Sequence, residues 1–185
     1  MFWIGARPGQ RPSLSPDKPT PERPSPIEHV VVQLEPPAGA RAQEILRSYL
    51  EDIVGRYHRR QATAAELALA LKEAPSDDLA PPQGVFLVAS MHEATTGCVG
   101  MRLLAGRTGE VTRLFVARHA RRQGLAMRLM DDLEQLARDR GLTRLRLDTR
   151  HDLIEARRLY ARRGFREIAP FNHGPYADHW LQKTL

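Results

Sequence analysis

The apolar run Leu114-Phe115-Val116 is followed by the basic turn Arg121-Arg122-Gln123-Gly124-Leu125-Ala126. The run is rich in branched and aromatic residues, which is typical of a strand. After the turn, apolar residues recur at helical spacing on one face, at Leu125, Leu129, Met130, Leu133, Leu136 and Ala137. The pattern therefore predicts a strand, a basic turn and a helix in succession.

This junction has the properties of an anion-binding site. The first N–H groups of a helix have no partner inside the helix, and they lie at the positive end of its dipole. Gly124 has no Cβ, so a ligand can approach the backbone closely, and the guanidinium groups of Arg121 and Arg122 suit phosphate. We therefore predict that this turn binds an anion, and a pyrophosphate fits it best.

Two short motifs resemble those of one enzyme family. Arg121-x-x-Gly124-x-Ala126 matches the Q/R-x-x-G-x-G/A signature of the GNAT family of acyl-CoA-dependent N-acetyltransferases. Ala156-x-x-Leu159-Tyr160-x-x-x-Gly164-Phe165 resembles the family's second signature, at the expected separation. The resemblance implies an α/β (α+β) GNAT fold, in which a mixed, mostly antiparallel central sheet is splayed at the acyl-CoA site and flanked by helices.

The remaining pattern agrees with this fold. We expect the order β, two helices, three strands, helix, strand, helix and two strands. Pro37 can open the first helix, and Thr63 with Glu66 forms a capping-box pattern at the second. The expected ranges are strands at 29–34, 85–89, 98–104, 110–116, 145–148, 165–168 and 176–182, with helices at 41–57, 63–73 and 153–163 around the long helix that ends at Gly141.

The chain divides into two unequal parts. Prolines recur among Ser, Arg and Gln at residues 1–26, so we expect a disordered, Pro-rich N-terminal arm there. The arm is either a tail without function or a polyproline ligand for a partner. Residues 27–185 form the predicted GNAT acetyltransferase domain.

Composition limits the function classes. The formal charge of +6 favours an anionic ligand. Cys98 is the only cysteine, which excludes an internal disulfide and fits a reducing compartment. The N-terminal apolar stretch is too short for a signal peptide, and no apolar run has transmembrane length. We therefore predict a cytoplasmic protein that binds no membrane, with a homodimer left open.

The resemblance implies roles for individual residues in acyl transfer. Glu110 aligns with the acidic residue that often acts as general base; the alternative is a structural carboxylate paired with Arg113 or Arg102. Tyr160 aligns with the tyrosine that protonates the leaving thiolate; the alternative is a half-buried aromatic residue whose hydroxyl bonds to the backbone.

Binding residues are implied in the same way. The backbone at Leu114, Phe115 and Val116 is expected to contact the pantetheine arm, beside the pyrophosphate turn at residues 121–126; the alternative is an edge defect of the sheet without a ligand. Many GNAT proteins have an asparagine before the second signature, where this chain has Arg150, which would contact a CoA phosphate instead. The acceptor pocket is expected to include Tyr57, His173 and Tyr176; for Tyr57 the alternative is a solvated helix end. No metal is expected, because His173 and His179 lack further ligands at suitable spacing.

These inferences predict an N-acetyltransferase that uses acetyl-CoA as acyl donor and an amine as acceptor. The amine would attack directly, because Cys98 has no basic partner in its segment to support a covalent enzyme intermediate. One alternative is a catalytically silent GNAT domain that binds CoA or protein for regulation. Another is a nucleic-acid binder, which we do not favour because the chain has no basic stripe interleaved with aromatic residues.

Overall fold

The structure is a computed structural model, and it describes residues 30–185. The predicted N-terminal arm lies outside the described residues, as does His29 at the start of the first predicted strand. The elements are β1 (Val30–Leu34), α1 (Ala40–His58), α2 (Ala64–Glu73), β2 (Gly84–Met91), β3 (Ala94–Leu104), β4 (Thr108–Val116), α3 (Leu125–Asp139), β5 (Arg144–Thr149), α4 (Ile154–Arg162), β6 (Arg166–Glu167) and β7 (His179–Thr184). Two 3₁₀ turns, η2 (Asp77–Leu79) and η3 (Arg118–Ala120), complete the order, which confirms the predicted succession.

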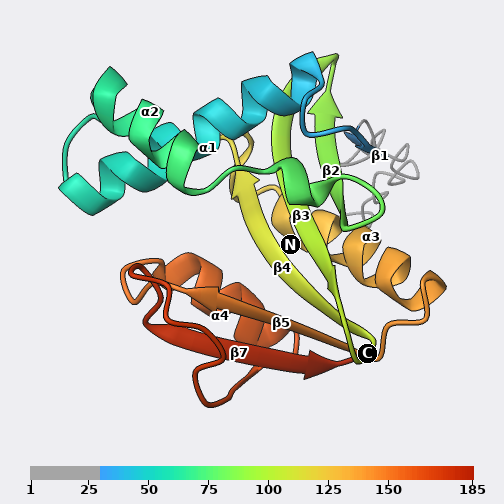
Figure 1. Cartoon of the computed structure of the whole chain (residues 1–185). Helices are drawn as coiled ribbons and strands as arrows, with labels where there is room; N and C mark the ends of the chain where they lie inside the picture. Colours follow the sequence, from blue (N-terminus) through green and yellow to red (C-terminus); the bar gives the residue numbers. More distant parts are fainter. Residues whose placement is uncertain (1–29) are drawn as a thin grey trace, which may run out of the picture.

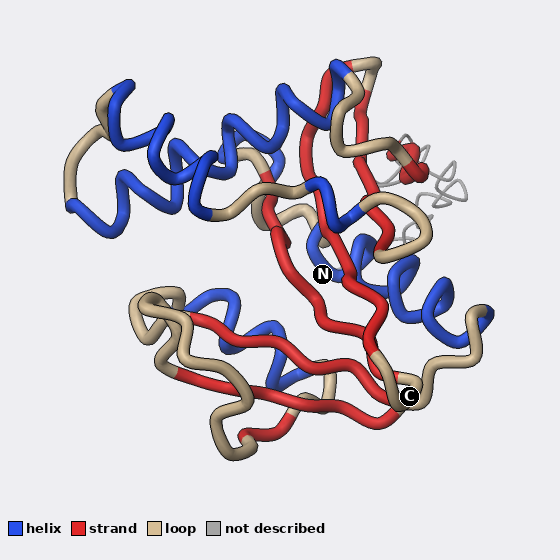
Figure 2. The backbone as a smooth tube through the Cα atoms, viewed as in Figure 1, coloured by secondary structure: helices blue, strands red, loops and turns tan. Residues whose placement is uncertain are grey.

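One seven-stranded sheet organises the molecule, in the order β1-β2-β3-β4-β5-β7-β6. Only β4 and β5 pair in parallel; the other neighbouring strands are antiparallel. The parallel pair is short, since Thr108, Gly109 and Glu110 pair with Arg144, Leu145 and Arg146 and the two strands then separate. Figures 1 and 2 show β4 and β5 running apart from this junction. The splayed sheet predicted from the resemblance is therefore present.

Each face of the sheet is covered by helices. The larger core joins one face of β2 to β5 with α3 and α4, and the smaller core joins the other face with α1. In β2 the side chains alternate between the two cores: Val85 and Leu87 lie in the larger, and Phe86 and Val88 in the smaller. This alternation confirms that the second strand is covered on both faces.

Several boundaries follow the predicted chemistry. Thr63 and Glu66 form the full capping box at the start of α2. Gly141 and Gly164 have φ values of 72° and 84° directly after α3 and α4, the left-handed conformation that ends helices. These residues act through local backbone geometry, which explains why sequence alone located them.

Three boundaries were predicted wrongly. Helix α1 begins at Ala40 with Gly39 as N-cap, since a turn from the carbonyl of Pro36 to the amide of Gly39 precedes it. Strand β3 begins at Ala94 because the β2–β3 connection is a tight turn at His92 and Glu93, both with positive φ. Strand β7 begins at His179, and the residues from Tyr176 to Asp178 belong to the preceding loop.

Candidate active site

The basic turn joins β4 to α3. Arg122 and Gly124 have φ values of 63° and 84°, and α3 begins at Leu125. The N–H groups of Leu125, Ala126 and Met127 therefore have no partner within the helix, and the side chain of Arg122 is exposed beside them. This arrangement fits a bound anion, because it offers backbone donors, the helix dipole and one free guanidinium group.

Arg121 has a different position from Arg122. Its Nε donates to the carbonyl oxygen of Val116 at 2.8 Å, and its Nη2 lies 3.1 Å from Asp52 of α1. Its guanidinium also lies over the ring of Phe115 at 5.7 Å. Arg121 thus fastens the turn to β4 and α1, and Gln123 closes it by donating to the carbonyl of His119 at 3.1 Å.

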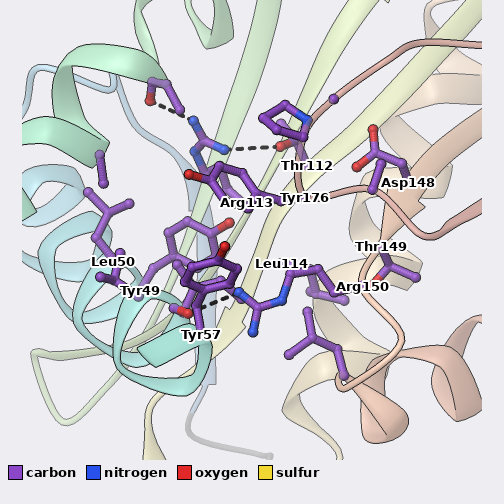
Figure 3. Close-up of a pocket in the computed structure, with 18 of the residues that line it drawn as sticks. Tyr49, Leu50, Tyr57, Thr112, Arg113, Leu114, Asp148, Thr149, Arg150 and Tyr176 are labelled. Carbon is purple, nitrogen blue, oxygen red and sulfur yellow. Dashed lines mark hydrogen bonds between the residues drawn. The ribbon is translucent and has the colours of Figure 1, made fainter. Parts of the chain in front are cut away.

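A cavity of about 600 Å³ lies where β4 and β5 separate. Its walls come from α1, α2, β4, β5, the start and middle of α4, and the loop before β7. The predicted residues on its wall are Tyr57, Glu110, Leu114, Arg150, Tyr160 and Tyr176. Figure 3 shows side chains from α1, β4 and the segment after β5 pointing toward one another.

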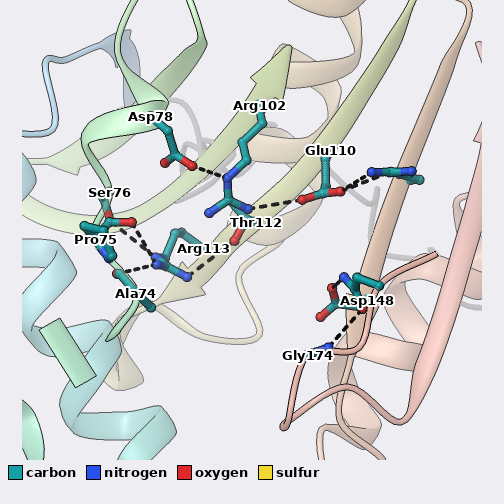
Figure 4. A network of polar contacts seen from close by, with 12 residues as sticks. Ala74, Pro75, Ser76, Asp78, Arg102, Glu110, Thr112, Arg113, Asp148 and Gly174 are labelled. Carbon is teal, nitrogen blue, oxygen red and sulfur yellow. Dashed lines mark hydrogen bonds and ion pairs between the residues drawn. The ribbon is translucent and has the colours of Figure 1, made fainter. Parts of the chain in front are cut away.

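Glu110 occupies the last paired position between β4 and β5. One carboxylate oxygen lies 3.2 Å from Nη1 of Arg102 on β3, and the other accepts from Nε of Arg146 on β5 at 2.9 Å (Figure 4). The pairing with Arg102 is one of the two alternatives expected from sequence, and the pairing with Arg146 was not expected. Nη2 of Arg146 lies 2.8 Å from the same oxygen, so the oxygen that faces Arg102 has fewer contacts and keeps a lone pair for a proton or a water molecule.

Tyr160 lies deeper in the cavity wall. Its side chain is buried in the larger core against Phe165, with the ring centroids 5.7 Å apart. Burial raises the pKa of Tyr160, and the nearby Tyr49 and Asp148 raise it further. The phenol therefore stays protonated at neutral pH and is available as a proton donor.

Arg150 does not join the basic turn. Its guanidinium donates to Asp152 at 2.8 Å and to the carbonyl of Ile53 at 3.1 Å, and it lies 5.5 Å from the centre of the Tyr57 ring. These contacts connect the segment after β5 to α1 across the cavity. A phosphate contact by Arg150 stays a prediction, and it would require the pair with Asp152 to open.

One side of the cavity is aromatic. The rings of Tyr57 and Tyr176 meet edge to face, with their centroids 5.3 Å apart. The structure thus brings together two of the three residues predicted for the acceptor pocket. His173 is exposed and is not on the cavity wall, which its neighbours Gly174 to Ala177 line instead.

Backbone positions on β4 complete the site. Phe115 is buried in the smaller core and its ring lies 6.1 Å from that of Tyr49, whereas Leu114 faces the cavity. The register of β4 against β3 shifts at this point, because Thr112 pairs with Gly100 and Phe115 with Cys98. Two residues of β4, Arg113 and Leu114, therefore face one residue of β3, which is a β-bulge.

Three cavity residues with polar or aromatic side chains, Tyr49, Arg113 and Asp148, were not predicted as site residues. The sequence suggested Arg113 only as a structural partner of Glu110. Residues 30–185 contain no cluster of three or more His, Cys, Asp or Glu side chains arranged to hold a metal ion. None of the helices described is both long and apolar enough to cross a membrane.

Comparison with known proteins identifies the family. The model of the acetyltransferase (GNAT) family matches residues 43–165, which include both signatures and the strands β4 and β5. The chain belongs to the GNAT acetyltransferase family. The GNAT chain is 33% identical over 103 residues to an uncharacterized N-acetyltransferase of Schizosaccharomyces pombe, and 39% identical over 101 residues to an IAA acetyltransferase of Azospirillum brasilense.

The curated relatives extend beyond the matched region. The two alignments cover 55% and 53% of this GNAT chain and 63% of each relative. Among solved structures, a GNAT acetyltransferase of Staphylococcus aureus Mu50 superposes with a TM-score of 0.67 at 16% identity, over 84% of this chain and 98% of that one. The PaiA N-acetyltransferase of Thermoplasma acidophilum, in complex with coenzyme A, gives 0.65 at 14% identity, over 84% and 99%. These similarities show the GNAT fold.

Proposed function

We propose that the protein transfers an acetyl group from acetyl-CoA to an amine by direct attack. The observation that carries this proposal is the opening between β4 and β5, which holds a cavity lined by Glu110 and the buried Tyr160, while the basic turn follows the end of β4. The exposed Arg122 and the free amides at the start of α3 fit the pyrophosphate of the donor. The backbone of residues 114–116 fits its pantetheine arm.

The proposed reaction uses each group once. The amine nitrogen attacks the thioester carbonyl carbon, a backbone N–H near Phe115 or Val116 stabilises the developing oxyanion, and the carbon–sulfur bond then breaks. Glu110 accepts the amine's proton, directly or through water, and Tyr160 donates its phenolic proton to the departing thiolate. The products are an acetamide and CoA.

The single cysteine supports direct attack over a covalent enzyme intermediate. Cys98 is fully buried in the smaller core, and its thiol donates to the carbonyl of Arg113 at 3.2 Å. Burial raises the pKa of the thiol far above its ordinary value. A nucleophilic cysteine requires the opposite environment, with access to solvent and a stabilised thiolate.

The test is a screen of amines with the full chain and acetyl-CoA, in which a thiol reagent follows CoA release. An accepted amine then allows Tyr160→Phe to be measured, a change that keeps the ring and removes the proton donor. We expect kcat to fall by roughly 10²- to 10⁴-fold while acetyl-CoA affinity changes little. Melting curves check that the variant is folded.

Two results would count against the proposal. Wild-type turnover by Tyr160→Phe would remove the acid role from that residue. Binding of acetyl-CoA without thiol release for any amine would instead favour the catalytically silent, regulatory alternative. The cytoplasmic location and the homodimer remain predictions from the sequence.

A further inference from the structure

The cavity contains one arginine whose charge is not balanced. Within the described part of the chain, each other cationic or histidine side chain on the cavity wall contacts a carboxylate: His58 contacts Glu66, Arg102 contacts Asp78 and Glu110, and Arg150 contacts Asp152. Arg113 contacts no carboxylate of residues 30–185. The cavity therefore holds a positive charge that a ligand can neutralise.

Neutral groups hold the Arg113 guanidinium in place. Nη2 donates to the carbonyl of Ala74 at 2.7 Å, Nε donates to the hydroxyl of Ser76 at 3.3 Å, and the group lies 5.5 Å from the centre of the Tyr49 ring. Nη1 has only a long contact of 3.5 Å, to the hydroxyl of Thr112 (Figure 4). The side chain is thus fixed while Nη1 keeps N–H groups for a ligand.

The backbone supports this position. Arg113 is the first residue of the bulge in β4, and its φ of 55° is uncommon for a residue with a Cβ. Bulges next to active sites re-aim side chains that a regular strand would place elsewhere. Both residues of the bulge, Arg113 and Leu114, line the cavity together with Thr112 before them.

Asp148 on β5 places a carboxylate on the opposite wall: it forms no ion pair with residues 30–185 and accepts only from the neutral side-chain amide of Asn172, at 2.7 Å. Glu73 is the other cavity carboxylate without an ion pair to these residues, but it ends α2 and precedes Ala74, to which Arg113 donates. Asp148 lies on β5, across the opening from Arg113 on β4 (Figures 3 and 4). A ligand with an ammonium group and an anionic group would complement both walls.

Aromatic rings form the remaining wall. Tyr49 lies beside Arg113, and Tyr57 and Tyr176 form the edge-to-face pair near it, with Tyr57 and Tyr176 half exposed. Such rings contribute large contact areas for apolar groups at low cost in side-chain entropy. The pocket therefore combines an arginine, a carboxylate on the opposite strand and aromatic rings beside the arginine.

We propose that the acceptor is an amine that also carries a carboxylate on an apolar or aromatic body, and that Arg113 binds this carboxylate. A guanidinium group suits a carboxylate, because its N–H donors match the geometry of the two oxygens. Asp148 attracts the ammonium group into the opening between β4 and β5, where Glu110 takes its proton and the free amine attacks the thioester. This inference rests on the proposed acetyl transfer to an amine, and it names the class of acceptor.

The experiment compares acceptors that differ only in the carboxylate. The pairs are phenylalanine with phenethylamine, tyrosine with tyramine, and leucine with 3-methylbutylamine, each assayed by CoA release with the full chain. We expect kcat/KM to favour the amino acid in at least one pair by about 10- to 100-fold, the range of a charged hydrogen-bonded contact. Equal rates within every pair, or a preference for the amine, would overturn this inference and leave the acetyl transfer standing.

Variants then assign the preference to Arg113. Arg113→Gln should lower kcat/KM for the amino acid to nearly that of its decarboxylated partner, whose own rate should change less than about threefold. Arg113→Lys, which keeps the charge but not the fork, should recover part of the preference. The matched control is Arg158→Gln, because Arg158 is exposed and does not line the cavity. This variant should keep the full preference for the amino acid. An unchanged preference in Arg113→Gln would overturn the assignment.

A binding measurement keeps the inference testable if no amine is turned over. With CoA present, calorimetry measures the affinity for the N-acetylated products of each acceptor pair. In at least one pair, the N-acetylated amino acid should bind more tightly than the N-acetylated amine. Arg113→Gln should remove this difference in affinity. Loss of turnover together with this binding pattern would refute acetyl transfer and retain the Arg113 site. Equal binding, or no binding of any of these products, would refute the Arg113 site.

Discussion

Glu134 connects the two signature segments from inside the core, and its removal should destabilise the protein strongly. Its side chain on α3 is 4% exposed and accepts from Nε of Arg163 at 2.9 Å and from Nζ of Lys183 at 2.6 Å. Arg163 is the last residue before Gly164 at the end of α4, and Lys183 lies on β7. Three elements therefore meet at one carboxylate.

The expected magnitude follows from the burial of its partners. The Arg163 and Lys183 side chains are 7% and 19% exposed. Glu134→Gln would leave Lys183 without this carboxylate and Arg163 with Asp131 alone, at 2.8 Å, while the more exposed Arg138 would lose a contact of 3.5 Å. Breaking a buried ion pair by removing one partner costs about 3–5 kcal/mol of stability. Because the substituted glutamine side chain keeps an oxygen that can accept a hydrogen bond, we expect a loss of about 3 kcal/mol. For a domain of this size, that loss corresponds to a fall in Tm of roughly 6–12 °C.

The same pair gives a pH dependence with a definite sign. Burial raises the pKa of Glu134, but hydrogen bonds from Arg163 and Lys183 and their charges outweigh it and lower the pKa below its ordinary value. The stabilisation is therefore present above the unfolded-state pKa of about 4.3 and is lost as pH falls through the lower folded-state pKa. The difference between wild type and Glu134→Gln should shrink in acid.

Thermal unfolding of both proteins between neutral pH and acid measures this prediction. The matched control is Glu51→Gln, an exposed residue of α1 without an ion pair to residues 30–185, which should change Tm by less than about 2 °C. If the Tm of Glu134→Gln at neutral pH differed from that of the wild type by less than about 2 °C, the reasoning about the buried carboxylate would be wrong.

Three further outcomes are expected. Acetyl-CoA should raise Tm by mass action, and Gly124→Glu should abolish this shift by placing bulk and negative charge in the basic turn; an undiminished shift would refute the placement of the pyrophosphate. Deletion of residues 1–25 should leave Tm and acetyl-CoA binding intact, and a loss of several degrees would show that the arm contributes to the fold. Glu110→Gln should lower the rate at neutral pH and flatten its rise with pH, because an amide accepts no proton; an unchanged pH profile would assign the base elsewhere.

Sequence was sufficient where local chemistry decides the structure. The capping box of Thr63 and Glu66, the left-handed glycines after α3 and α4, and the switch from strand to helix at Gly124 each depend on a few neighbouring residues. The element order came from the apolar patterns and turn signals, and the observed elements confirm it. The splay came from the resemblance to the GNAT family, and the short pairing of β4 with β5 confirms it.

The cavity was harder to predict because it depends on contacts between distant segments. No glycine or proline marks the bulge at Arg113, whose left-handed backbone is held by the surrounding structure. The second ion pair of Glu110 comes from Arg146, which is 36 residues away. Likewise, His173 and Tyr176 look equivalent in sequence, but only Tyr176 packs against Tyr57 and reaches the cavity wall.

The early separation of β4 and β5 has a consequence for amide hydrogen exchange. Beyond Glu110 and Arg146, the backbone groups that each strand turns toward the other have no partner in a ladder, although both strands lie in the middle of the sheet. Their other edges stay paired, β4 with β3 and β5 with β7. Amides along β4 should therefore alternate between slow exchange, where they face β3, and fast exchange, where they face the opening. The facing sides of β4 and β5 should therefore exchange their amide hydrogens like the edge strands of a sheet, although both strands lie at its centre.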